Sequence, residues 1–139
     1  MPLCSLEEAL EDLRNGKFVI VVDDEQRENE GDLVIAAEKM TTEAVNFIVT
    51  HARGLLCMPM LGERLDELEM PLMISENAAV KEQTAFTVSV DYKIGTTTGI
   101  SAHDRASTFT AITDPTVSAL DFARPGHVFP LRYREGGVL

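Results

Sequence analysis

Two short apolar runs, residues 18–22 (FVIVV) and 33–37 (LVIAA), enclose the segment 23–32 (DDEQRENEGD). Both runs are short and rich in branched aliphatic residues, as expected of buried β-strands. The segment between them carries six carboxylates and one arginine, so it must either stay hydrated or bind a cation that neutralises it. We therefore expect two strands joined by a strongly acidic connection.

The rest of the chain predicts a mixture of helices and strands. Ser5 and Glu8 have the spacing of a capping box and Gly16 is a stop signal, so a helix is expected at about 6–14. Further helices are expected at about 41–52, 62–68 and 101–112, strands at about 55–60, 85–91 and 127–134, and loops at about 70–84 and 94–101.

Residues 85–91 (AFTVSVD) alternate between apolar and polar side chains. This pattern predicts a half-buried strand, with Phe86, Val88 and Val90 on one face and the polar side chains on the other. Hairpin and crossover connections both occur along the chain. They predict a mixed β-sheet with helices packed on it, in the α/β or α+β class.

Composition and charge exclude several classes of function. The 139 residues include 12 basic and 23 acidic side chains, and 16 of the acidic ones lie in residues 1–70. With no basic stripe or polybasic segment, neither a nucleic-acid partner nor an anionic membrane surface is expected. No apolar run reaches the roughly 18 residues of a membrane helix. The acidic N-terminus is unlike a secretory signal, so we expect a cytoplasmic protein with reduced thiols at Cys4 and Cys57.

The acidic segment is the first candidate site. If residues 28–32 are extended, Glu28, Glu30 and Asp32 project to one side. Carboxylate oxygens suit Mg²⁺, and the fork of Arg27 suits a phosphate or a carboxylate. The alternative is a solvated acidic turn, which charge runs usually form.

Two further segments carry candidate groups. Residues 95–101 (GTTTGIS) precede a capped helix and could form either an anion cradle or an exposed turn. His127 follows Pro125 and Gly126 at a strand start, where it is either an acid/base group or a structural histidine. His51 and His103 have helical contexts and are interpreted as structural. Cys57 alone would be interpreted as a buried, inert thiol.

The segments DDEQRENEGDLVIAAE, GTTTGISAHDR and ARPGHVFPLR, in this order, resemble the 3,4-dihydroxy-2-butanone-4-phosphate synthase family of riboflavin biosynthesis. The resemblance covers nearly the whole chain. It implies a single three-layer α/β domain with a mixed, twisted sheet flanked by helices. It also implies a lyase that converts D-ribulose 5-phosphate to L-3,4-dihydroxy-2-butanone 4-phosphate and formate. Mg²⁺ (or Mn²⁺) and no organic cofactor would assist enolisation and a skeletal rearrangement, in a homodimer with active sites at its interface.

The same resemblance assigns roles to residues of this sequence. It implies Glu28 as metal ligand, catalytic and substrate-binding residue; His127 as acid/base group; Glu30 and Cys57 as further catalytic-site residues; and Arg27, Asp32 and Thr98 as substrate contacts.

The family pattern continues past Leu139 with a second metal-ligating histidine and further phosphate contacts. Residues 1–139 are therefore expected to be the N-terminal two-thirds of one domain, truncated at its C-terminal end. The alternatives are a truncated, non-catalytic domain that binds a phosphate sugar or a partner, and an acidic cation-binding module.

Overall fold

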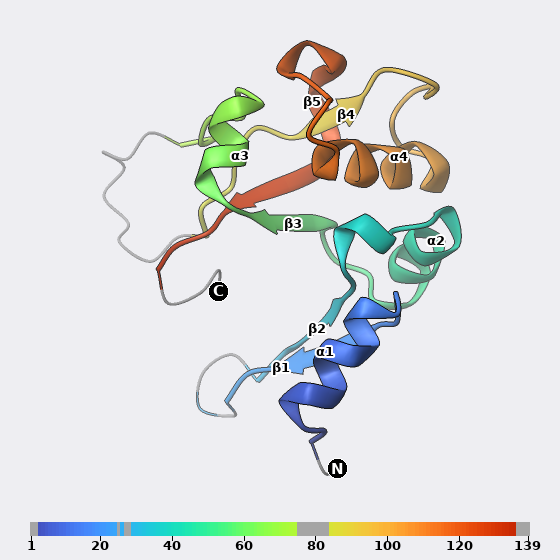
Figure 1. The fold of residues 1–139 in the computed structure, drawn as a ribbon, viewed down its shortest axis with the longest axis vertical. Helices are drawn as coiled ribbons and strands as arrows, with labels where there is room; N and C mark the ends of the chain where they lie inside the picture. The colour runs from blue at the N-terminus through green and yellow to red at the C-terminus, as the bar shows by residue number, and fades with distance from the viewer. Residues whose placement is uncertain (1–2, 25, 27–28, 75–83, 136–139) are drawn as a thin grey trace.

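The computed structural model describes residues 3–24, 26, 29–74 and 84–135. Figure 1 shows the arrangement of the helices and strands. In chain order they are α1 (Leu6–Arg14), β1 (Val19–Val22), β2 (Gly31–Val34), the 3₁₀ turn η1 (Ala37–Lys39), α2 (Thr42–His51), β3 (Cys57–Met60), α3 (Gly62–Glu67), β4 (Val90–Tyr92), α4 (Ala102–Thr113), η2 (Ala119–Asp121) and β5 (Phe122–Arg132).

The central sheet has the order β3-β5-β4. Strand β5 runs parallel to β3, with Cys57 opposite Phe129, and antiparallel to β4, with Val90 opposite Val128. The predicted α/β class with a mixed sheet is confirmed. In the part of the chain that the structure describes, β1 and β2 form a separate two-stranded antiparallel sheet.

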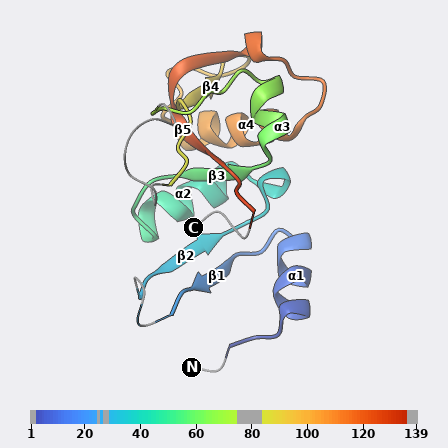
Figure 2. The same ribbon diagram turned by 90° about the vertical axis from the view of Figure 1, so that its left-hand side faces the viewer.

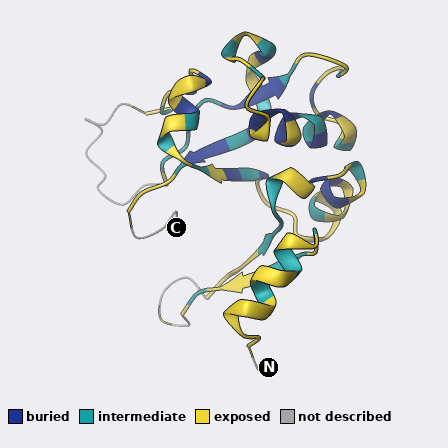
Figure 3. Ribbon diagram, viewed as in Figure 1, coloured by how far each residue is buried: buried dark blue, intermediate teal, exposed yellow. Residues whose placement is uncertain are grey.

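Helix α4 joins the central sheet to the rest of the core. Its buried residues Phe109 and Ile112 belong to one apolar cluster with Met58 of β3, Val90 of β4 and Val128 of β5. Helix α2 in turn packs on α4. Figure 3 shows this region as the buried centre of the molecule.

The β1–β2 hairpin and α1 lie at one end of the molecule, apart from the central sheet, in the views of Figures 1 and 2. The rings of Phe18 and Phe47 stack at 5.2 Å and connect this end to α2. The interpretation of residues 18–22 as a buried strand is wrong: Ile20, Val21 and Val22 are exposed. Among the described residues no third strand pairs with β1 or β2, and α1 contributes no buried residue over them.

The predicted helices are observed within about two residues, and side-chain caps mark the starts of three of them. Ser5, Thr41 and Ser101 each accept a backbone N–H from the first turn of the helix that follows. Strand β2 lies earlier than the predicted residues 33–37. Its partner β1 begins at Val19, opposite Val34, so the backbone beyond Val34 has no strand to pair with.

Residues 85–91 differ most from their prediction. Strand β4 comprises only Val90–Tyr92, and the polar side chains of Thr87, Ser89 and Asp91 are buried. Each has a hydrogen-bond partner in β5: the Thr87 hydroxyl donates to a backbone carbonyl, while Ser89 and Asp91 accept backbone N–H groups. The alternating pattern predicted that the face with these polar side chains is exposed to solvent. That face is buried instead, because each polar group on it has a hydrogen-bond partner inside the protein.

Within the described residues, no helix is both long and apolar enough to span a bilayer.

Candidate active site

His127 and Asp91 form a close pair between β5 and β4. The Nδ1 atom of His127 lies 2.7 Å from Oδ2 of Asp91, and the backbone N–H of His127 donates to Oδ1 at 2.8 Å. Asp91 is buried, whereas 40% of the His127 side chain is exposed. A buried carboxylate thus holds a partly exposed imidazole.

The sequence RPGH places His127 by means of a bulge. Val90 pairs with Val128 while the next residue of β4, Asp91, pairs with Ala123, so residues 124–127 are extra on β5. Bulges of this kind re-aim side chains beside functional sites. Gly126 makes the bulge possible, since a Cβ there would overlap the backbone of β4, and its N–H donates to the Ser89 hydroxyl at 3.1 Å.

The threonine loop, residues 94–101, is organised around Asp104 of α4. Oδ2 of Asp104 accepts the Thr97 hydroxyl at 2.7 Å and the backbone N–H groups of Thr97 and Gly99 at 3.2 and 3.0 Å. The Thr97 hydroxyl, followed by those N–H groups, lowers the pKa of Asp104 to about 2. The loop donors thus bind an internal carboxylate, and Thr98 remains exposed beside them.

The threonine loop also meets the histidine pair. Gly99 lies against the carboxylate of Asp91, with no space for a Cβ between them. The structure therefore brings the loop that carries Thr98 next to the pair that holds His127.

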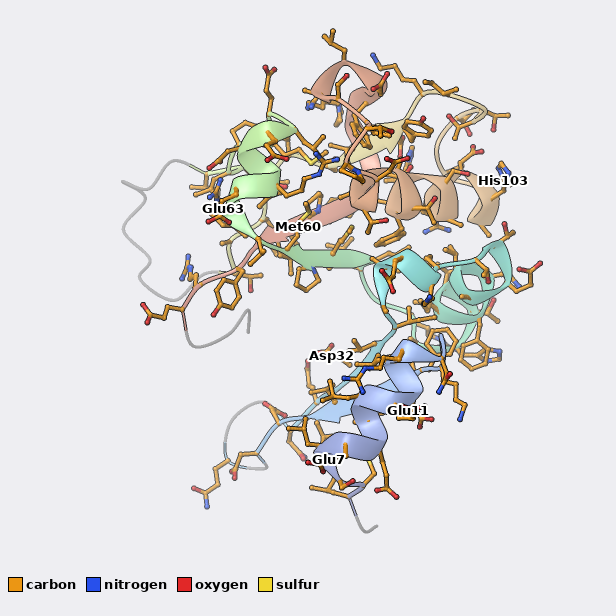
Figure 4. The ribbon with its side chains drawn as sticks, viewed as in Figure 1. Glu7, Glu11, Asp32, Met60, Glu63 and His103 are labelled. Atoms are coloured by element: carbon orange, nitrogen blue, oxygen red, sulfur yellow. The ribbon has the colours of Figure 1, made fainter. Side chains whose placement is uncertain are left out.

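His103 lies beside Asp104 on the solvent side. It lies at the N-terminal end of α4 with 63% of its side chain exposed, and its Nδ1 atom is 3.4 Å from Oδ1 of Asp104. Figure 4 shows it at the edge of the molecule, at the start of α4, whereas Asp32 lies near the middle of that view.

The acidic segment is described in part. Arg27 and Glu28 lie outside the described residues. The backbone N–H of Glu30 donates to Asp23 Oδ1 at 2.8 Å, and Asp32 pairs with Val21 in the hairpin. Both Glu30 and Asp32 are exposed.

Cys57 lies in β3, close enough to the hairpin for the charge of Asp32 to act on its thiol. Burial and, to a lesser extent, the carboxylate of Asp32 raise the pKa of the Cys57 thiol. Cys57 lies opposite Phe129, which is two residues from His127 along β5. Cys57 and His127 are both half-buried, whereas Met58 and Val128, the residues next to them in their strands, are buried in the core.

The predicted metal ligand, Glu28, lies outside the described residues, and those that are described gather no cluster of three or more His, Cys, Asp or Glu side chains. The neighbouring donors nevertheless suit a hard cation. Within the described ranges, no basic side chain forms an ion pair with the carboxylates of Glu30 or Asp32. Exposed carboxylate oxygens are the ligands that Mg²⁺ prefers.

An apolar hollow between β3, α3 and α4 is lined by Met58, Met60 and Ile112, among others. None of the predicted site residues lines this hollow. The candidate chemistry therefore lies elsewhere, around the partly exposed side chain of His127.

Asp91 is the residue of this site that sequence reasoning missed. Its signal was a carboxylate at the end of the predicted strand 85–91, which was assigned to the polar face of that strand. A carboxylate between apolar residues that flank it on both sides is as well explained by a buried partner.

This fold and site define a mixed α/β domain that combines an acidic hairpin with a histidine–aspartate pair. The family model described as 3,4-dihydroxy-2-butanone 4-phosphate synthase matches residues 7–139. The chain belongs to this family.

Relatives and solved structures agree with this assignment. The chain is 57% identical over 138 residues to the 3,4-dihydroxy-2-butanone 4-phosphate synthase of Schizosaccharomyces pombe, covering 99% of this chain and 67% of that protein. It is 55% identical over 136 residues to a bifunctional riboflavin biosynthesis protein, RIBA 1, chloroplastic, of Arabidopsis thaliana, covering 97% of this chain and 25% of that one.

A crystal structure of 3,4-dihydroxy-2-butanone 4-phosphate synthase in complex with two magnesium ions has a TM-score of 0.91 and 48% identity. That match covers 98% of this chain and 63% of the other. The chain thus spans between a quarter and two-thirds of these proteins.

Proposed function

We propose that the native protein that carries this chain is a lyase of riboflavin biosynthesis. It converts D-ribulose 5-phosphate to L-3,4-dihydroxy-2-butanone 4-phosphate and formate. Family membership supports the reaction class. The observation that carries the proposal within the structure is the partly exposed His127, held at 2.7 Å by a buried carboxylate.

The reaction depends on proton transfers rather than on a redox group. The two products together contain all the atoms of the substrate, so no oxidant, reductant or organic cofactor enters the balance. Enolisation removes a proton from carbon, and loss of a hydroxyl group needs a proton donor. An imidazole changes its protonation near neutral pH and can serve in both directions. His127 is the residue to which we assign this role.

The acidic segment would hold the divalent cation, Mg²⁺ or Mn²⁺. In this proposal Glu28 is the metal ligand of the chain, and Glu30 lines the same segment. When bound, the cation stabilises negative charge that develops on the sugar oxygens. A relative of known structure carries two magnesium ions, which supports a divalent cation here.

Other residues would bind and orient the sugar phosphate. Arg27 offers a forked donor to its oxygens, Asp32 accepts its hydroxyl groups, and Thr98 donates from the threonine loop. Cys57 would line the site as a neutral thiol, because its raised pKa keeps it protonated at neutral pH.

We further propose a homodimer with active sites at its interface, in the cytoplasm. Exposed apolar side chains on β1, including Ile20 and Val22, support a further contact surface. The free thiols of Cys4 and Cys57 support a reducing compartment.

The test is formate production by the protein at its native length. Incubation with D-ribulose 5-phosphate and Mg²⁺ should release formate, followed by proton NMR, and EDTA should abolish it. Glu28→Gln and His127→Ala should each lower kcat by about 100-fold or more. Glu43→Gln, a change of an exposed carboxylate on α2, is the matched control and should retain full activity.

No formate from the wild-type protein would rule the lyase out. Saturable binding of ribulose 5-phosphate without turnover would instead support the non-catalytic domain that binds a phosphate sugar. Formate release that is insensitive to both EDTA and Glu28→Gln would contradict the metal-dependent mechanism.

A further inference from the structure

Asp91 directs both of its carboxylate oxygens at one residue. Oδ1 accepts the backbone N–H of His127 at 2.8 Å, and Oδ2 lies 2.7 Å from Nδ1 of the same histidine. Only 8% of Asp91 is exposed. The carboxylate therefore contacts both the backbone and the ring of His127.

We propose that Asp91 is the positioning residue of His127 and fixes it as the Nδ1–H tautomer, with Nε2 unprotonated and free to accept a proton. An ionised carboxylate only accepts hydrogen bonds, so the ring nitrogen that faces it must carry the hydrogen. A neutral imidazole has one N–H, which leaves the other nitrogen, Nε2, as the acceptor. The inference rests on the proposed function insofar as His127 is taken to move protons.

The surroundings of Asp91 restrict its carboxylate to this arrangement. Gly99 of the threonine loop lies against the carboxylate oxygens, and Gly126 packs on the backbone of β4 one residue away. A buried carboxylate enclosed in this way has little freedom to rotate away from His127. The ring is held in orientation as well as in protonation.

A purely structural role, in which Asp91 only anchors the bulge, makes a different prediction. The substitution Asp91→Asn separates the two roles, because an amide has one acceptor oxygen and one donor group. If its oxygen accepts the backbone N–H of His127, its NH₂ group faces Nδ1, which must then lose its hydrogen. The bulge can remain intact in this variant, but the Nδ1–H tautomer of His127 cannot.

The experiment uses protein labelled with ¹⁵N-histidine, at its native length and without substrate. Long-range ¹H–¹⁵N correlation spectra above neutral pH should show His127 protonated at Nδ1 and bare at Nε2. In Asp91→Asn the hydrogen should move to Nε2. Formate assays should then show kcat lowered by about 10²- to 10⁴-fold, with a much smaller change in KM.

Two variants serve as controls. Ser89→Ala removes the acceptor of the Gly126 N–H and so loosens the bulge without touching the carboxylate. Asp114→Asn makes the same chemical change at an exposed aspartate that also accepts a backbone N–H and a side-chain donor. Both should keep the Nδ1–H tautomer of His127.

A wild-type His127 protonated at Nε2 would overturn the proposal. The spectrum of the wild-type protein therefore tests the proposal even if Asp91→Asn does not fold. An unchanged tautomer in a folded Asp91→Asn protein would overturn it as well, as would the same shift in Ser89→Ala. Failure of the proposed function gives a different result, namely no formate from a wild-type protein whose His127 still has the Nδ1–H tautomer.

Discussion

Gly99 lies directly against the carboxylate of Asp91, so the threonine loop and strand β4 meet where one residue has no side chain. A Cβ at position 99 would overlap the Asp91 oxygens. The backbone at Gly99 also has φ +87°, a conformation that residues with a Cβ rarely adopt. Gly95, in the same loop, has φ +73° but no atom within 4 Å of an added Cβ.

These two glycines separate backbone strain from steric overlap. Gly95→Ala adds only strain and should lower the free energy of unfolding by about 1 kcal/mol. Gly99→Ala adds strain and displaces the Asp91 carboxylate, so it should cost about 2–4 kcal/mol. Urea denaturation of both variants measures the difference. Equal losses would mean that the loop moves aside without disturbing Asp91.

The activity of the same two glycine variants tests the contact with Asp91 a second time. Gly99→Ala should lower kcat because it shifts the carboxylate that holds His127, whereas Gly95→Ala should leave kcat within about twofold of the wild type. A Gly99→Ala protein with full activity would show that the contact with Asp91 is not needed for His127 to work.

Local signals were enough to predict much of the fold. The capping side chains Ser5, Thr41 and Ser101 marked three helix starts, a branched aliphatic run marked β1, and the apolar run 55–60 marked β3. These signals act over three or four residues, so the sequence alone contains them. The residues RPGH also singled out His127, whose role as an acid/base group stays a prediction.

Relationships between distant segments were not predictable in the same way. The partner of His127 is 36 residues away, and only the pairing of β4 with β5 brings Asp91 to it. The exposure of Ile20 and Val22 likewise depends on what packs beside the hairpin, which their own pattern does not specify. Charge and spacing marked Arg27 and Glu28, for which metal ligation and substrate contact remain predictions.

Asp104 should make stability depend on pH. Its pKa is lowered from 3.8 to about 2 by hydrogen bonds that exist only in the folded protein. This contribution is fully present above pH 3.8 and is lost as the pH falls towards about 2, because the unfolded state then binds the proton first. The difference in unfolding free energy between wild type and Asp104→Asn should therefore shrink as the pH falls through this window.

Urea denaturation at several pH values between about 2 and 6 tests this window. Glu69→Gln, a change of an exposed carboxylate just after α3, is the control and should run parallel to the wild type. A difference between wild type and Asp104→Asn that stays constant across the window would contradict the hydrogen bonds of the threonine loop.

Cys57 should react slowly with thiol reagents. Burial, followed by the charge of Asp32, raises the pKa of its thiol, whereas Cys4 is exposed. At about pH 7.5, iodoacetamide should modify Cys4 first and Cys57 at least tenfold more slowly, because the thiolate is the reactive species. Mass spectrometry of the peptides gives both rates in one sample.

The contribution of Asp32 to this slowness can be isolated. Asp32→Asn removes the negative charge and should speed the modification of Cys57 without affecting Cys4, which serves as the internal reference. An unchanged Cys57 rate would assign the raised pKa to burial alone and would mean that the hairpin carboxylate does not act on β3.

Arg64 of α3 joins that helix to the last turn of α4 and to the segment that follows it. Its guanidinium donates to the carbonyl oxygens of Ile112, Asp114 and Val117 at 3.1, 2.7 and 3.3 Å. It also contacts Glu67 at 3.0 Å. The Arg64 side chain is 22% exposed and that of Glu67 is 64% exposed, so the carbonyl contacts are the better protected ones.

Replacing Arg64 should therefore be costly, while removing its carboxylate partner should not. Arg64→Met leaves three carbonyls without their donor and should lower the free energy of unfolding by about 2–3 kcal/mol. Glu67→Gln breaks only an exposed ion pair and should change it by less than about 0.5 kcal/mol. Arg64→Lys should fall between them, because one ammonium group cannot reach three carbonyls arranged around a planar fork. Urea denaturation of the three variants ranks them, and a loss in Glu67→Gln as large as that in Arg64→Met would show that the ion pair, rather than the carbonyl contacts, holds α3 in place.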